Sequence, residues 1–195
     1  YNTLVLVSGN YQGPGERNAE RIKNWVAEGN TLILQRTAVE YALGKGWISE
    51  EKLGGGVPSE NEGQRLSYVE ASERSGARQI GGSVYEAHLD ITHPIGFGYQ
   101  RDHINVYRNH SILMKPSSSP YSTVVQYGNR DQLDGYVHQD WLPLIKGSAS
   151  VLVSPIGRGR AISFVDNPNF RGFWYGTNKM MLNALFFGSH ISVPR

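Results

Sequence analysis

The chain has 195 residues, a hydrophobic fraction of 39% and a formal net charge of +2 from 19 basic and 17 acidic residues. This length and composition predict one soluble domain with a real core, and the dispersed basic residues predict no nucleic-acid partner. No apolar run reaches the roughly 18 residues of a membrane span. The absence of cysteine excludes a disulfide framework, a cysteine-ligated zinc site and a thiol nucleophile.

The first part of the chain alternates apolar runs with helical patterns. Residues 4–7 are a continuous apolar run, which is typical of a strand buried on both faces, and residues 31–35 are predicted to be the next buried strand. Helices are predicted from about residue 16 to 28 and over residues 37–43. The first helix has an apolar stripe that consists of Ala19, Ile22, Trp25 and Val26. Strands and helices that alternate over short links predict parallel strands joined by right-handed crossovers.

Residues 49–82 have a different composition, because they are polar and rich in glycine and glutamate. We expect a polar excursion from the sheet here, with a short helix near residues 68–74. A link this long is unusual inside a compact domain. A surface insertion is the favoured interpretation, and a lid or an interaction surface is the alternative.

The second half of the chain predicts short strands, at residues 84–90, 104–107, 112–114 and 123–127. A β-hairpin is predicted for residues 150–153 and 160–165, because a tight Gly157-Arg-Gly159 turn lies between them. A last helix is predicted from about residue 177 to 187. Its inward side chains are expected to be Met181, Leu182, Leu185 and Phe186.

The densest group of titratable side chains is His88, Asp90 and His93. His88 and Asp90 share one face of the predicted strand, so they could form half of a metal site. The remaining candidate ligands stand at no diagnostic spacing; they are His103, His110 and His138. We therefore predict no metal in this domain, and a histidine that hydrogen-bonds the turn at Pro94.

The richest polar and aromatic cluster follows residues 160–165 and consists of Asp166, Asn167, Asn169, Arg171, Trp174 and Tyr175. These side chains could bind a carboxylate or a sugar, with a bidentate contact from Arg171. They could instead cap the last helix and fix the loop, which is the favoured interpretation. The chain has no Gly-x-Ser-x-Gly motif, so the usual serine-hydrolase signature is absent.

Three stretches carry a resemblance to a known family: residues 22–29 (IKNWVAEG), 90–99 (DITHPIGFGY) and 159–187, which includes FVDNP, FRGFWYGT and NALFF. The chain resembles the C-terminal domain of secreted bacterial zinc carboxypeptidases of the M14 family. That domain is similar to class I glutamine amidotransferases. The resemblance implies an α/β fold, a three-layer flavodoxin-like sandwich whose sheet is mostly parallel with an added antiparallel hairpin.

The resemblance also implies the wider context. Residues 1–195 would be a single domain that lacks its first strand and helix, which would precede Tyr1. An upstream peptidase domain of the same chain would hold the zinc, and this domain would hold no cofactor. The protein would be secreted or periplasmic, and the uncovered sheet edge could pair with another copy in a homo-oligomer.

The resemblance finally assigns positions to the catalytic groups. The amidotransferase nucleophile is a cysteine on a sharp turn after a strand, and here Arg36 or Thr37 occupies the corresponding turn. The position of the amidotransferase histidine falls near Asp166. Without a thiol and an imidazole base, the acyl-transfer triad cannot operate. We therefore expect a non-catalytic accessory domain that supports or orients the peptidase domain or binds its substrate.

A degenerate pocket is expected at the carboxyl ends of the strands, lined by Arg36, Thr37, His93, Asp166 and Arg171. Two other functions stay open. A glycan-binding or oligomerisation module would be favoured by a flat platform of exposed aromatic side chains. An amide or ester hydrolase with Thr37 as nucleophile would be favoured by a base within hydrogen-bond reach.

Overall fold

The computed structural model describes residues 1–11, 15–54, 65, 67–130 and 132–192. The strands form one eight-stranded sheet in the order β1-β2-β8-β7-β5-β3-β4, and β6 pairs with β3. The strands are β1 (Thr3–Leu6), β2 (Thr31–Gln35), β3 (Gly82–Leu89), β4 (His103–Arg108), β5 (Thr123–Tyr127), β6 (Asp134–Tyr136), β7 (Ala149–Ile156) and β8 (Gly159–Phe164). The α-helices are α1 (Glu16–Ala27), α2 (Thr37–Gly44), α3 (Ala71–Ala77), α4 (Leu142–Ile145) and α5 (Tyr175–Phe187).

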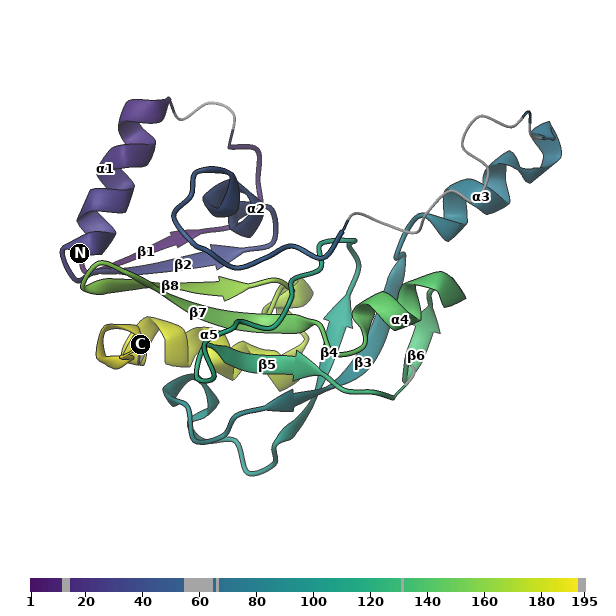
Figure 1. Cartoon of the computed structure of the whole chain (residues 1–195). Helices are drawn as coiled ribbons and strands as arrows, with labels where there is room; N and C mark the ends of the chain where they lie inside the picture. Colours follow the sequence, from purple (N-terminus) through teal and green to yellow (C-terminus); the bar gives the residue numbers. More distant parts are fainter. Residues whose placement is uncertain (12–14, 55–64, 66, 131, 193–195) are drawn as a thin grey trace.

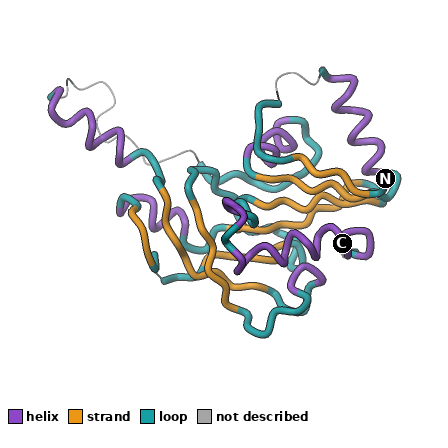
Figure 2. Tube along the Cα trace, turned by 180° about the vertical axis from the view of Figure 1, so that it is seen from behind, coloured by secondary structure: helices purple, strands orange, loops and turns teal. Residues whose placement is uncertain are grey.

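The elements form three layers, with α1 and α2 on one face of the sheet and α5 on the other (Figures 1 and 2). All five residues of β2 are buried. Leu32 and Leu34 belong to the core that α1 and α2 cover, whereas Ile33 belongs to the core beneath α5. A strand covered on both faces buries the side chains that point in both directions, which explains the apolar run Leu32–Leu34 at its centre. The predicted α/β, flavodoxin-like sandwich is confirmed.

The sheet has a parallel part and an antiparallel part. β1, β2 and β8 pair in parallel, and β7 and β8 form the predicted antiparallel hairpin. Antiparallel pairing continues from β7 through β5 and β3 to β4, so it extends further than the single hairpin that the sequence predicted.

The turn between β7 and β8 depends on glycine. Gly157 has a φ of +60°, in the left-handed region that L side chains rarely adopt. A Cβ on Gly159 would lie 1.9 Å from the carbonyl oxygen of Val26. The backbone N–H of Arg158 donates to the carbonyl of Ala27 at 2.9 Å. The hairpin tip therefore packs directly against the end of α1.

Two sequence predictions about elements are wrong. Residues 112–114 form no strand; only Met114 makes isolated bridges, to Lys52 and Ala149. In α5 Met181 is buried as predicted, whereas Leu182, Leu185 and Phe186 are 50%, 41% and 73% exposed, and the other buried residues are Thr177, Met180, Asn183 and Ala184. Apolar residues occur all around this helix and the sheet covers one side of it, so the sequence pattern did not fix its rotation.

The polar excursion at residues 49–82 is described in part, because residues 55–64 and 66 lie outside the described residues. The short helix predicted near residues 68–74 corresponds to a 3₁₀ turn at Tyr68–Glu70 followed by α3. Figure 1 shows α3 projecting away from the sheet. The indole N–H of Trp141 donates to the carbonyl of Ala77 at 2.9 Å and joins the end of α3 to the body. None of the described helices has the length and apolarity to cross a bilayer.

Candidate functional site

A strained turn lies between β2 and α2. Arg36 connects the two elements with φ 50° and ψ −111°, and it is one of two described non-glycine residues with positive φ. Such a conformation costs about 1–3 kcal/mol. The backbone N–H of Arg36 donates to the carbonyl of Phe164 at 2.9 Å, which holds the turn against the end of β8. Sharp strand-to-helix turns of this kind present the nucleophile in α/β hydrolases.

The hydroxyl of Thr37 fixes the loop that follows β1. It donates to the carbonyl of Gly9 at 2.9 Å and accepts the N–H of Gly9 at 2.8 Å. The Ser8 hydroxyl lies 3.2 Å from the same oxygen. Among the described residues no histidine or carboxylate hydrogen-bonds to Thr37, so its hydroxyl has a structural partner and no base.

Asp166 is the centre of a buried polar network at the carboxyl end of β8. Its side chain is 4% exposed and forms an ion pair with the fully buried guanidinium of Arg108, at 3.2 Å from Oδ1. The hydroxyls of Tyr127 and Ser150 donate to Oδ2 at 2.8 and 2.7 Å. Nε2 of His110 lies 3.1 Å from Oδ1. The network therefore gathers side chains on and beside β4, β5 and β7 around one carboxylate.

The network keeps Asp166 ionised. Burial alone would raise the pKa of this carboxyl, but the charge of Arg108 and the hydrogen bonds from His110 and Ser150 outweigh it and lower the pKa to about 2. Burial also acts to lower the pKa of Arg108, and Asp166 and Tyr127 reverse that effect and raise it. Asp166 and Arg108 are therefore a buried, fully charged pair at neutral pH.

The hydrogen bonds of His110 fix its tautomer. Its Nδ1 accepts the backbone N–H of Ile112 at 3.2 Å, so the proton is on Nε2, which donates to Asp166. Burial lowers the pKa of His110, and the charges of Arg108 and Arg36 lower it further, against the opposing hydrogen bond to Asp166. Both ring nitrogens of His110 are therefore engaged in hydrogen bonds within the protein. The His110–Asp166 pair resembles part of a catalytic triad, but its imidazole has no free lone pair with which to act as a base.

Arg36 lies near enough to this network for its positive charge to lower the pKa of His110. Its Nε is buried without a hydrogen-bond partner. In the part of the chain that the structure describes, no carboxylate lies within ion-pair distance of Arg36. Arg36 and Arg108 are positive, Asp166 is negative and His110 is neutral, so the cluster carries one uncompensated positive charge. An anionic ligand is the chemical group that this arrangement favours.

The other predicted pocket residues lie in separate contacts. Nδ1 of His93 accepts the N–H of Ile95 at 3.2 Å, at the start of the 3₁₀ turn Pro94–Gly96, as predicted for a histidine that fixes the proline turn. Arg171 is exposed, and its guanidinium carbon lies 5.3 Å from the ring centroid of Phe170. No hydrogen bond between described residues joins either side chain to Arg36 or Asp166.

The sequence prediction missed four partners of Asp166: Arg108, His110, Tyr127 and Ser150. One signal was available for Arg108. In β4 the residues at positions 104, 106 and 108 are all buried, and the first two are apolar. A charged residue in the inward phase of an alternating strand needs a buried counter-charge.

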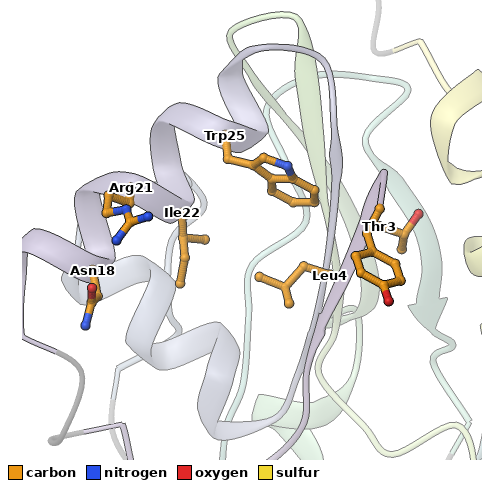
Figure 3. Close-up of a pocket in the computed structure, with 7 residues that line it drawn as sticks. Thr3, Leu4, Asn18, Arg21, Ile22 and Trp25 are labelled. Carbon is orange, nitrogen blue, oxygen red and sulfur yellow. The ribbon is translucent and has the colours of Figure 1, made fainter.

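A second hollow lies away from the strand ends. It has a volume of about 670 Å³ and lies between α1 and the edge strand β1 (Figure 3). Leu4, Ile22 and Trp25 give it an apolar lining, and each of these side chains is only half-buried. β1 is the edge strand on this side of the sheet. That another copy of the chain pairs with this edge stays a prediction.

No family model matches the sequence, and no curated protein matches it. Solved structures do. A ThuA-like protein from Parabacteroides merdae has a TM-score of 0.58 at 13% identity, over 100% of this chain and 72% of that one. A second ThuA-like protein, from Bacteroides uniformis, has a TM-score of 0.52 at 11% identity, over 95% and 68%. A cytoplasmic protein from Salmonella typhimurium has a TM-score of 0.50 at 13% identity, over 96% and 71%. At these identities the likeness shows the fold alone, and this chain has the glutamine amidotransferase-like fold that ThuA-like proteins share.

Proposed function

We propose that this chain is a non-catalytic accessory domain of a zinc metallocarboxypeptidase. We also propose that the strand-end cluster, which consists of Arg36, Arg108, His110 and Asp166, binds a peptide carboxylate. The peptidase context rests on the sequence resemblance alone, and the fold is the one that this resemblance implies. In this proposal an upstream domain of the same chain holds the zinc. The whole protein is secreted or periplasmic, and this domain orients the peptidase domain or its substrate.

The observation that carries the proposal is the side chain at the strained turn. Arg36 stands where a hydrolase of this architecture presents its nucleophile, and a guanidinium stays protonated and non-nucleophilic at neutral pH. The same group is well suited to bidentate recognition of a carboxylate. Its lack of an ion-pair partner among the described residues leaves it available for one. The geometry therefore supports recognition of an anion without cleavage.

The hydrolase alternative has little support from the contacts. Thr37 would need a base within hydrogen-bond reach, and its hydroxyl is bonded to Gly9 and lies beside Ser8. The unprotonated nitrogen of His110, Nδ1, already accepts the backbone N–H of Ile112. Neither group is arranged to activate a nucleophile.

The first experiment measures turnover. The pure domain is incubated with glutamine and with a nitrophenyl ester, and we expect no release of ammonia or nitrophenol above the buffer rate. Turnover that Thr37→Ala abolishes would overturn the proposal in favour of the hydrolase.

The second experiment measures binding. A tetrapeptide with a free C-terminal carboxylate and its C-terminal amide are titrated into the domain by calorimetry. We expect the free acid to bind better, and Arg36→Ala to weaken it by about 10- to 100-fold, the value of a hydrogen bond to a charged group. Arg17→Ala, on the exposed face of α1, is the matched control and should bind as the unaltered protein does. Equal binding by Arg36→Ala and Arg17→Ala would remove the carboxylate site from the proposal.

A glycan-binding module is the second candidate, because aromatic side chains gather beside the last helix. The rings of Tyr107 and Phe170 stack at 4.0 Å between centroids, and Phe173 packs edge-on to Phe170 at 6.0 Å. Phe173 and Tyr175 are 55% and 74% exposed. Retention of the domain on insoluble polysaccharide, lost in the variant Phe173→Ala/Tyr175→Ala, would favour this function.

A further inference from the structure

We propose that His88, Asp102 and His103 form a site for a divalent transition-metal ion of the zinc type. The sequence pattern had grouped His88 with Asp90 and His93. The structure instead places His88 opposite His103 in the antiparallel ladder of β3 and β4. Directly opposed residues project from the same face of a sheet, so the two imidazoles are neighbours although fifteen positions separate them. Their ring centroids are 5.5 Å apart.

The carboxylate of Asp102 lies between the two imidazoles. Its Oδ1 is 2.6 Å from Nδ1 of His103, and its Oδ2 is 3.6 Å from Nδ1 of His88. One ligand atom from each of the three residues lies within 4.8 Å of the others. Zinc bonds of about 2.0–2.1 Å with tetrahedral angles place ligand atoms about 3.3 Å apart. The observed separations lie on either side of that spacing, so small side-chain rotations would bring all three groups onto one ion.

The surroundings of the three residues suit an ion that keeps exchangeable ligands. The side chains of His88, Asp102 and His103 are 59%, 49% and 57% exposed. They line a hollow of about 490 Å³ beside the end of β3, which gives water or a further ligand access to the remaining positions. The charge of Asp102 favours a cation, and the neighbouring Asp90 carboxylate is already bonded to the N–H and hydroxyl of Thr92.

The donor set indicates the class of ion. Two imidazoles and one carboxylate suit zinc and its neighbours in the first transition row and suit magnesium or calcium poorly, because those ions prefer an all-oxygen set. With three protein ligands, the site has the composition of open zinc sites and not of closed structural ones. A bound ion would join β3 to β4, which is the edge strand at this end of the sheet.

The test is calorimetric titration of Zn²⁺ into the tag-free domain, with Mg²⁺ as a second probe. We expect one equivalent of Zn²⁺ to bind and Mg²⁺ to give no heat. Each single change, His88→Gln or His103→Gln, should weaken Zn²⁺ binding at least about tenfold, since even residues that only orient a ligand cost 10- to 100-fold. His138→Gln is the matched control, because His138 also lies beside a carboxylate, Asp140 at 3.1 Å, with no second imidazole paired to it among the described residues.

A second readout does not depend on heat. Zn²⁺ at a hundredfold excess over its dissociation constant should raise the Tm by about 5–10 °C in the unaltered protein. The double variant His88→Gln/His103→Gln should fold without zinc and lose that rise. Unchanged Zn²⁺ affinity in the double variant, or no binding by the unaltered protein at millimolar Zn²⁺, would overturn the site. Neither result would affect the proposal that Arg36 binds a carboxylate, because Arg36 is not part of the metal site.

Discussion

Replacing Asp166 by asparagine tests the physical basis of the strand-end cluster. The change keeps the volume of the side chain and removes its charge. The guanidinium of Arg108, which is fully buried, would then have no counter-charge. Leaving one member of a buried ion pair unpaired costs about 3–5 kcal/mol. That is a large part of the roughly 5–15 kcal/mol that stabilises a typical domain.

The assay is urea unfolding, supported by thermal melting. For a domain of this size, we expect Asp166→Asn to lower the Tm by about 6–20 °C, at 2–4 °C for each kcal/mol. The double variant Arg108→Met/Asp166→Asn should cost less than the sum of the single changes, because it leaves no buried charge unpaired. Asp134→Asn, on the exposed strand β6, should change the stability by less than about 0.5 kcal/mol. A loss below about 1 kcal/mol in Asp166→Asn would refute the buried-pair argument.

The same residue predicts that the free energy of unfolding falls at acidic pH, which we call the acid limb. The pKa of Asp166 falls from 3.8 to about 2 on folding. A shift of this size corresponds to about 2 kcal/mol, because each unit is worth about 1.4 kcal/mol. Since the folded pKa is the lower one, this stability is fully present above about pH 4 and is lost as the pH falls towards 2. The acid limb should be shallower in Asp166→Asn, and an equally steep limb in both proteins would contradict the assignment.

Three further predictions concern local geometry. At pH 7, nitrogen NMR should show His110 as the neutral Nε2–H tautomer; a protonated ring would contradict the hydrogen bond from Ile112. Arg36→Gly should be more stable than Arg36→Ala by about 1 kcal/mol in urea, because glycine relieves about 1–3 kcal/mol of strain at a smaller entropic cost. Gly159→Ala should lower stability by about 2 kcal/mol or more, since its Cβ would clash with the Val26 carbonyl, and an unchanged midpoint would contradict the close approach.

The fold was predictable where the sequence period is unambiguous. The buried run at residues 31–35 became β2 with its predicted bounds, and the alternating pattern at residues 84–90 became β3, which spans Gly82–Leu89. The hairpin of β7 and β8 followed from its glycine turn. These elements are specified by residues close together in the chain. Strand order and the extent of antiparallel pairing depend on contacts between distant segments, which a local pattern does not contain.

The site was predictable to a smaller degree for the same reason. Asp166 was singled out in the polar cluster that follows a buried strand, where α/β folds place their chemistry, and Arg36 through the resemblance to amidotransferases. His110 and Tyr127 reach Asp166 only through the lateral order of β4, β5 and β7 in the sheet. The pairing of His88 with His103 likewise requires the register of two strands. Sequence spacing alone gave no access to either arrangement.

The strained turn at Arg36 belongs to the scaffold, because the backbone around it is held independently of its side chain. Its N–H is bonded to Phe164, and the next residue, Thr37, is bonded to Gly9. A strained conformation persists when its surroundings over-determine it. The turn therefore presents whichever side chain the sequence supplies, and placing a thiol there would not create an amidase. We expect Arg36→Cys to leave glutamine intact, because Nδ1 of His110 already accepts the N–H of Ile112 and no free base remains to form the thiolate. Measurable ammonia release by Arg36→Cys would show that His110 leaves this hydrogen bond, and it would refute the view that the fold itself keeps the site inactive.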